Sequence, residues 1–266
     1  AVNAEEIRKA LAADPKIAAV YTTLCETSTG IIQDIAVIGK VVKDTPALLV
    51  VDGISSVGAV PMETDLWGVD MLVVGSQKAL MIPPGLACLT VSPKAWAKVE
   101  KTKAPAYYFS LKAAKDELKT FDTPFTPAIT LIVGLRKSLD LLKAEGIVNV
   151  WKRHKLLADA TRAGVKALGL ELFAEAPSDS ITAVKAPPGI DGELIPKKMA
   201  ADYGIRIAGG QSEMKGKVFR IGHMGYVDKL DVLSALAALE LTLNDLGVKV
   251  ELGTAVRAAE QVFLKR

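Results

Sequence analysis

Three short apolar runs in the first third of the chain constrain the fold most strongly. They are Ala47–Val51, Met71–Val74 and Leu86–Val91. None alternates strictly with polar residues, which is typical of strands that are covered on both faces in an α/β sheet. Such sheets bind their ligands at the carboxyl ends of the strands. Asp52 follows the first run directly, and Lys78 comes four residues after the second.

A carboxylate and an amine at neighbouring strand ends suggest a particular chemistry. A lysine in apolar surroundings loses its proton more easily and can then attack a carbonyl carbon. The commonest use is a Schiff base to pyridoxal phosphate, whose pyridine nitrogen an acidic partner keeps protonated. Lys78 and Asp52 are candidates for these two roles. The motif alone is weak, because a turn cap beside a solvated lysine explains most such pairs.

The order of the elements predicts a parallel sheet in the first half of the chain. A strand over Ile17–Leu24 and a helix over Ile35–Lys43 precede the strand at Ala47–Val51. Repeated strand–helix–strand order is typical of βαβ units and a mostly parallel sheet. Further helices are predicted over Ala4–Ala13, Pro93–Lys101, Ala128–Glu145 and Ile147–Leu168.

The pattern changes after Gly146, where we place a domain boundary. We therefore expect a large domain over residues 1–145 and a small C-terminal domain over 146–266. Short strands and helices that follow one another without regular alternation predict an α+β domain with a mainly antiparallel sheet. The strands are expected at Leu170–Phe173, Ile181–Lys185, Ile205–Ile207 and Lys217–Gly222, and the helices at Asp191–Tyr203, Asp228–Leu246 and Leu252–Phe263.

Composition argues against several classes of function. The net charge is +3 over 266 residues with the signs mixed, so neither a nucleic-acid partner nor a polyanion is indicated. The two cysteines, Cys25 and Cys88, are expected to be buried thiols, and the two histidines are too few for a metal site. The chain contains no apolar run of membrane-spanning length and no signal peptide, so a cytoplasmic protein is expected.

The residues around Asp52 and Lys78 carry a family resemblance. VDGISSVGAVPMETDLWGVDMLVVGSQKALMIPPGLA resembles the cofactor segment of class V (fold-type I) pyridoxal-phosphate aminotransferases, especially the alanine–glyoxylate, serine–glyoxylate and serine–pyruvate branch. The shared words are V-D-x-x-x-S-x-G, G-x-D and G-S-Q-K-A-L followed by P-P-G, and the resemblance spans essentially the whole chain. It implies an α/β fold with a mostly parallel cofactor-binding sheet, flanking helices and a smaller C-terminal α+β domain.

The resemblance also implies a segment that this chain does not carry. Family members have roughly a further third of a chain before the position of Ala1. That third supplies a Gly/Ser-rich phosphate loop and the aromatic residue that stacks on the cofactor ring. We therefore expect a fragment, a cleaved form or one piece of a split enzyme.

The resemblance assigns the cofactor residues. Lys78 carries pyridoxal 5'-phosphate and transfers protons, and Asp52 pairs with the ring nitrogen. Gln77, Thr27 and Ser55 contact the cofactor, with Thr27 inside the branch's E-[ST]-S-T-G loop. Taken locally, that loop also fits a helix N-cap. Gln77 stands where sulfur-abstracting desulfurases usually have histidine.

Two further site residues lie outside the cofactor segment. Thr126 precedes a predicted helix N-terminus, a position that suits phosphate. The resemblance places it on the cofactor phosphate of a partner subunit, which implies a homodimer with shared sites. Arg220 lies in a strand pattern, where arginines usually point to solvent. The resemblance instead makes it the fork that binds the substrate carboxylate. The aromatic run Tyr107–Phe109 is expected to pack in the core.

These assignments predict a function. The expected reaction is transamination between alanine or serine and glyoxylate or pyruvate, with no metal. Aspartate or phosphoserine transamination, cysteine desulfuration and a non-catalytic subunit remain alternatives. A nucleotide-binding protein is poorly supported, because the chain has neither G-x-G-x-x-G nor G-x-x-x-x-G-K-[ST] at a strand-to-helix turn.

Overall fold

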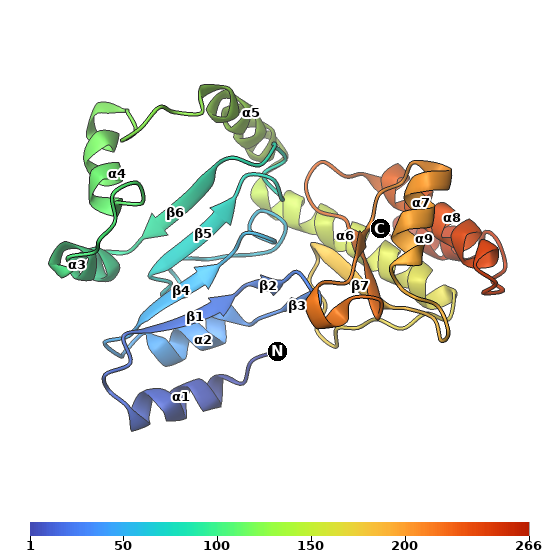
Figure 1. Cartoon of the computed structure of the whole chain (residues 1–266), viewed down its shortest axis with the longest axis horizontal. Helices are drawn as coiled ribbons and strands as arrows, with labels where there is room; N and C mark the ends of the chain where they lie inside the picture. The colour runs from blue at the N-terminus through green and yellow to red at the C-terminus, as the bar shows by residue number, and fades with distance from the viewer. Residues whose placement is uncertain (266) are drawn as a thin grey trace.

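The computed structural model describes residues 1–265. Its larger sheet has the order β1-β4-β5-β6 (Figure 1). The strands are β1 Ala19–Thr23, β4 Leu48–Asp52, β5 Met71–Gly75 and β6 Ala87–Val91. β1, β4 and β5 run parallel to one another, and β6 is antiparallel to β5. The predicted mostly parallel sheet is therefore confirmed, and all three apolar runs are strands.

Helix α2 (Ile35–Val42) shows how sequence specifies one face of this sheet. The side chain of Asp34 accepts a hydrogen bond from the Val37 amide and so caps the helix. Ile35, Ile38 and Val42 are buried in one cluster with the strands. The other helices of this half are α1 Ala4–Ala13, α3 Pro93–Lys101, α4 Leu111–Glu117 with the 3-10 turn Leu118–Thr120, and α5 Ile129–Glu145. The sequence had not predicted α4.

The two faces of the large sheet are covered unequally, contrary to the expectation from the apolar runs. In β4, Leu49 and Val51 are buried while Leu48 and Val50 are partly exposed. Strand β5 alternates in the same way. An apolar run shows that both faces of a strand carry apolar side chains. Whether each face is covered depends on helices that are distant in sequence.

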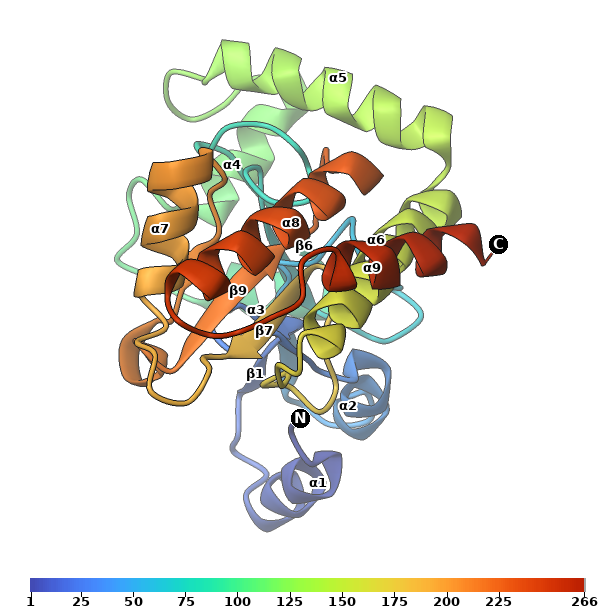
Figure 2. The ribbon, with the colours of Figure 1, turned by 90° about the vertical axis from the view of Figure 1, so that its right-hand side faces the viewer.

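The smaller sheet is antiparallel, as predicted, in the order β7-β9-β8. Its strands are β7 Ile181–Lys185, β8 Ala208–Gly209 and β9 Val218–Gly222. Figure 2 shows α8 in front of this sheet and α9 in front of α6, and α6 contacts both helices and β7. The helices are α6 Ile147–Ala167, α7 Leu194–Tyr203, the 3-10 turn Ser212–Met214, α8 Lys229–Asp245 and α9 Thr254–Leu264.

Two predicted strands of the small domain are wrong. Within Leu170–Phe173 only Leu172 bridges a strand, namely at Val184. The strand expected at Ile205–Ile207 forms instead at Ala208–Gly209, where it pairs with β9. Both segments are apolar because they pack on the core cluster. Backbone hydrogen bonds from Phe173 to Ala183 (2.9 Å) and from Lys185 to Glu171 (2.8 Å) flank the single bridge at Leu172.

A buried carboxylate shapes the end of the chain. Helix α9 has no side-chain cap of its own at Gly253. Glu240 of α8 lies 3% exposed and accepts hydrogen bonds from the amides of Gly253 (2.7 Å) and Ala255 (2.5 Å). The negative group therefore satisfies free N–H groups at the positive end of the helix dipole.

The hydrophobic residues form two clusters, with α6 passing from one to the other. Val150 is buried with the large sheet, and Leu157 with the small one. This arrangement supports a division near Gly146, which remains our proposal. Among residues 1–265, no helix combines the length and apolarity needed to cross a membrane.

The aromatic run was placed incorrectly by sequence reasoning. Tyr107 is 85% exposed and Phe109 is 84% exposed, so the expected core packing is wrong. Tyr108 stacks on Phe125, with ring centroids 4.6 Å apart. The aromatic residues pack on one another at the surface rather than in either core cluster.

Candidate active site

The carboxyl ends of β1, β4 and β5 bring the predicted cofactor residues to one edge of the large sheet. Thr23 pairs with Asp52, and Asp52 pairs with Val73 of β5. After β1 the chain forms a hairpin of β2 (Cys25–Glu26) and β3 (Ile31–Ile32), where the sequence had suggested a loop. Parallel strands thus align the segments that hold Thr27, Asp52 and Lys78.

Thr27 and Ser55 meet across this edge. Their hydroxyl groups are hydrogen-bonded to each other, and Ser55 is buried. Asp52 is exposed at the strand end, and its carboxylate accepts a hydrogen bond of 2.9 Å from the Ile54 amide. The carboxylate is therefore oriented by its own turn while it remains accessible.

The loop that carries Lys78 is braced from within. The hydroxyl of Ser76 donates to the Pro83 carbonyl (2.8 Å) and accepts from the Leu86 amide (3.2 Å). Lys78 is partly buried and Gln77 is exposed beside it. The Pro-Pro-Gly turn is thus tied to the strand end and holds the lysine segment in place.

Arg220 is buried in β9 with only 5% of its surface exposed. The usual solvent-pointing orientation is therefore wrong for this strand arginine. Its Nε donates to the Gly209 carbonyl (2.9 Å), and its Nη1 donates to the Thr27 carbonyl (2.8 Å) and to Oε1 of Gln211 (3.3 Å). Within residues 1–265, no acceptor lies on Nη2. The two N–H groups of Nη2 are therefore available to an anion.

Two carboxylates lie in the electrostatic surroundings of Arg220. Burial lowers the pKa of its guanidinium, and the carboxylates of Glu193 and Glu26 act in the opposite direction. Glu193 is itself held by the Gly210 amide (3.1 Å). Hydrogen bonds from Ser28 lower the pKa of Glu26, so this carboxylate stays charged.

A second contact joins the small domain to the Lys78 loop. A Cβ on Gly225 would lie 3.1 Å from the Lys78 carbonyl oxygen, and Gly225 has φ +85°, so glycine fits on both counts. The amide of Gly225 donates to Nε2 of His154 (2.9 Å), and Arg153 donates to its carbonyl (3.0 Å). The sequence analysis did not predict a role for Gly225. The only signal was the glycine itself, the residue that most readily adopts a left-handed backbone.

His154 is a neutral acceptor in this contact. Its Nδ1 lies 2.7 Å from the Val150 carbonyl, to which it must donate, so Nε2 accepts from Gly225. Burial lowers the pKa of His154 and favours this neutral form.

Thr126 is the one predicted site residue that lies neither at the edge of the large sheet nor in β9. It is exposed on the loop before α5, and no hydrogen bond or ion pair found in residues 1–265 joins it to the other predicted residues. Thr27 is hydrogen-bonded to both Ser55 and Arg220, and the parallel register aligns the strand that ends at Asp52 with the strand that leads to Gln77 and Lys78.

Comparison with known families settles the relationship. The model of the family described as aminotransferase class V matches residues 1–232. The chain belongs to the class V aminotransferases. This is a family of pyridoxal-phosphate enzymes with the fold-type I architecture, which confirms the predicted fold and cofactor.

Individual class V relatives cover nearly all of this chain but are themselves longer. A protein named soluble hydrogenase, small subunit, from Synechococcus is 44% identical over 92% of this chain and 65% of its own length. A serine–glyoxylate aminotransferase from Methylorubrum extorquens is 41% identical over 96% of this chain and 66% of its own. The chain thus spans about two thirds of the length of these class V relatives.

A solved structure agrees with the class V fold. Pyridoxamine–pyruvate aminotransferase from Mesorhizobium loti superposes with a TM-score of 0.94 at 34% identity, over 98% of this chain and 69% of the other.

The donor set at the sheet edge fits pyridoxal phosphate. The cofactor ring needs an anion for its basic nitrogen, hydroxyl or amide partners for its substituents, and an amine for its aldehyde. Asp52, the hydrogen-bonded hydroxyls of Thr27 and Ser55, and Lys78 supply these groups at neighbouring strand ends. Among residues 1–265, no group of three or more His, Cys, Asp or Glu is placed to hold a metal ion.

Proposed function

We propose that this chain takes part in pyridoxal-phosphate-dependent transamination between alanine or serine and glyoxylate or pyruvate. The observation that carries the proposal is the buried Arg220, whose guanidinium is hydrogen-bonded to the segment that holds Thr27. A fork suited to a carboxylate thus faces the edge that suits the cofactor. The names of the serine–glyoxylate and pyridoxamine–pyruvate relatives support this reaction class.

The residues at the sheet edge have separate tasks in this proposal. Bound pyridoxal phosphate supplies an electron sink for the carbanion formed at the substrate Cα. Asp52 would hold the proton on the pyridine nitrogen. Thr27, Ser55 and Gln77 would orient the ring substituents. The Lys78 amine would hold the cofactor at its aldehyde carbon and move the proton between the substrate Cα and the cofactor C4′, as general base and then as acid.

Arg220 would bind the carboxylate of the amino acid and later that of the 2-oxo acid. One buried arginine suits small monocarboxylic substrates, because each substrate brings one carboxylate to the site. An acidic donor such as aspartate needs a second cation, for which Arg206 is the candidate, and this residue is exposed. A panel of alanine, serine, glycine and aspartate as donors, with glyoxylate and pyruvate as acceptors, separates these cases.

The same substrate panel, extended to cysteine and phosphoserine, detects the other reactions of the class V family. Sulfide release from cysteine would indicate desulfuration, and turnover of phosphoserine would indicate phosphoserine transamination. Cofactor binding without turnover of any donor would indicate a non-catalytic subunit.

A homodimer with shared sites is part of the proposal. The exposed aromatic side chains Tyr107, Phe109 and Phe121 lie near the loop of Thr126, and α5 exposes Ile129 and Val133. Apolar groups gathered on a surface favour a protein partner. In a dimer, Thr126 would reach the cofactor phosphate of the partner subunit. Sedimentation equilibrium of the chain and of Phe121→Ser tests this, and a monomer at micromolar concentration contradicts it.

A cytoplasmic location is also proposed. Cys25 and Cys88 are both free thiols, which agrees with a reducing compartment.

The absorption spectrum tests the central step. We expect a visible band after pyridoxal phosphate is added to the purified chain, and its loss when alanine is supplied. Borohydride treatment should fix the cofactor on the peptide that contains Lys78, and Lys78→Ala should abolish both signals. A band that persists unchanged in Lys78→Ala contradicts the assignment.

A further inference from the structure

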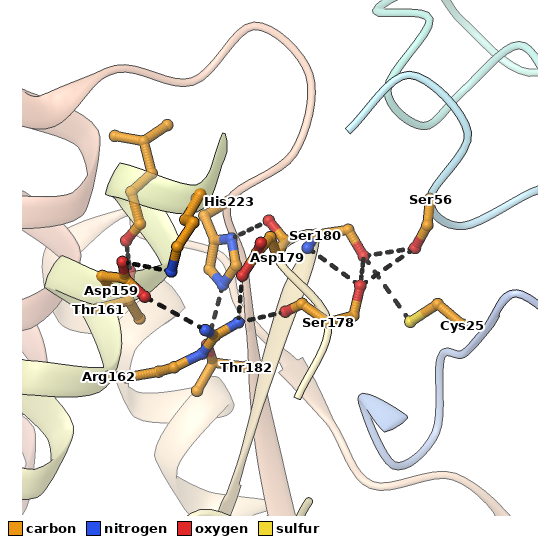
Figure 3. Close-up of polar contacts among 12 residues, drawn as sticks. Cys25, Ser56, Asp159, Thr161, Arg162, Ser178, Asp179, Ser180, Thr182 and His223 are labelled. Carbon is orange, nitrogen blue, oxygen red and sulfur yellow. Dashed lines mark hydrogen bonds and ion pairs between the residues drawn. The ribbon is translucent and has the colours of Figure 1, made fainter. Parts of the chain in front are cut away.

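A cluster of buried hydroxyl groups joins the two domains beside the candidate site (Figure 3). Ser56 lies in the turn after β4, directly after Ser55, whereas Ser178 and Ser180 lie on the segment that enters β7. All three side chains are fully buried. The Oγ atom of Ser180 lies 2.7 Å from that of Ser56 and 2.9 Å from that of Ser178, and the third distance is 3.3 Å.

We call Ser56, Ser178 and Ser180 the hydroxyl cluster. Its members can satisfy one another's hydrogen-bonding groups. If the three hydrogens run round the triangle in one direction, each hydroxyl donates once and accepts once. The Ser180 amide also donates to the Ser178 hydroxyl (3.3 Å), and Cys25 Sγ lies 3.8 Å from the Ser180 hydroxyl. Because water is excluded, loss of one hydroxyl leaves each of the other two short of one hydrogen-bond partner. The cluster therefore holds the two chain segments together.

The small-domain side of the cluster leads directly to Arg220. The Ser180 carbonyl accepts a hydrogen bond from the His223 amide (3.1 Å), three residues after Arg220. The His223 ring donates from Nδ1 to the Asp179 carbonyl (3.0 Å), so its Nε2 accepts from the Thr182 hydroxyl (2.9 Å). These contacts attach the end of β9 to the segment that carries the serines.

A helix braces the same segment. Arg162 of α6 donates to the Ser178 carbonyl (2.5 Å) and to the Asp179 carboxylate (3.0 Å). Figure 3 shows this arginine and His223 on one side of Ser178 and Ser180, with Ser56 and Cys25 on the other.

The contacts close a ring around the candidate site. Arg220 is bonded to Thr27, whose hydroxyl meets that of Ser55. Ser55 is covalently joined to Ser56, whose hydroxyl meets that of Ser180, and Ser180 returns through the end of β9 to Arg220. Arg220 is therefore connected to the Thr27 and Ser55 hydroxyls by two routes, one directly through Thr27 and one through β9, Ser180 and Ser56.

We propose that Ser56 and Ser180 are positioning residues that set the placement of Arg220 relative to Thr27, Ser55 and Lys78. The proposal rests on the proposed function, because it assigns the substrate carboxylate to Arg220. If the hydroxyl cluster is broken, β9 shifts against the large domain, and the arginine no longer meets the carboxylate in the productive geometry. A displaced guanidinium binds the carboxylate less tightly, because the paired hydrogen bonds depend on its orientation.

Kinetics distinguish positioning from general damage. We expect Ser56→Ala and Ser180→Ala each to raise the KM for the amino acid roughly tenfold, while kcat and the affinity for pyridoxal phosphate change by no more than about twofold. The loss in the double variant should be smaller than the sum of the two single losses, because both substitutions remove the Ser56–Ser180 contact. Ser56→Cys, which keeps a weak donor of similar size, should recover part of the loss. An equal loss of cofactor affinity would overturn the proposal.

Hydrogen exchange gives a second readout that needs no cofactor. Ser56→Ala should speed amide exchange in the peptide 218–225, in the other domain. Thr161→Val is the matched control, because within residues 1–265 the buried Thr161 hydroxyl bonds only to the Leu157 carbonyl of its own helix (2.8 Å). Faster exchange confined to residues 53–60 would sink the proposal. If the unmodified chain shows no cofactor band, the proposed function fails, and the exchange result still decides the structural coupling. Should Ser56→Ala not fold, Ser56→Cys enters both measurements.

Discussion

Nη1 of Arg220 donates a hydrogen bond of 2.8 Å to the carbonyl oxygen of Thr27, across 193 residues of sequence. This bond joins the strand β9 of the small domain to the segment after β1 of the large sheet. The large domain thereby orients the guanidinium that we assign to the substrate carboxylate. A single change in either segment is therefore expected to alter the other.

Arg220→Lys tests the carboxylate fork. A lysine offers a point charge in place of a planar pair of donors. Loss of one charge-assisted hydrogen bond of about 1.5–3 kcal/mol predicts a KM for the amino acid that rises roughly 10- to 100-fold. The cofactor band should persist. Steady-state kinetics measure the change, with the exposed Arg257→Lys as the control. An unaltered KM would remove Arg220 from the substrate site.

The Gln211 side chain already accepts a hydrogen bond from the Arg220 guanidinium. Its side-chain oxygen accepts from Nη1 at 3.3 Å, on a side that a bidentate carboxylate would also use. We expect Gln211→Ala to lower the KM for the amino acid by a few-fold, since a competing acceptor is removed. Gln211→Glu should raise it about tenfold, because its carboxylate forms a charge-assisted hydrogen bond in place of the neutral one. Equal KM values in all three proteins would show that the substrate does not displace this contact.

Stability should fall as the pH is lowered from 7 to 5, because of the buried histidines. Burial lowers the pKa of His223 to about 3, whereas the ordinary value is 6.5. Below pH 6.5 the unfolded chain binds a proton that the folded chain excludes, so acid favours unfolding. Between pH 6.5 and 5 this one group destabilises the fold by about 2 kcal/mol. His154 acts in the same direction.

Urea unfolding at pH 7, 6 and 5 measures this effect. His223→Asn should be less stable at pH 7, because the hydrogen bonds of the ring are lost, and its stability should depend less on pH over this range. A variant with the same pH dependence as the unmodified chain would exclude His223 as the titrating group.

Glu240→Ala should destabilise the small domain by about 2–4 kcal/mol, since two amides at the start of α9 lose a buried anionic acceptor. Glu240→Gln should lose less, because its side-chain oxygen still accepts. Urea unfolding gives both values. Glu260→Ala, an exposed change on α9, should stay within about 0.5 kcal/mol of the unmodified chain. Equal stability of Glu240→Ala and Glu260→Ala would contradict the capping role.

Strand ends and helix caps were predictable because their signals are local. The strand that leads into Asp52 and the start of α3 at Pro93 are both found where the sequence predicts them. The surface position of Tyr107 was not predictable, because a run of aromatic residues looks the same in the sequence whether it packs in a core or on an exposed face.

The sequence by itself determined the family, the parallel strands and the positions of Asp52 and Lys78 in the chain, since periodicity and motif spacing are written in consecutive residues. Only the tertiary structure decided that Arg220 is buried against Thr27, that Gly225 lies beside the Lys78 backbone and that Ser56 meets Ser180. Each of these contacts joins segments more than 120 residues apart. These contacts form only after both domains have packed, so no pattern in consecutive residues predicts them.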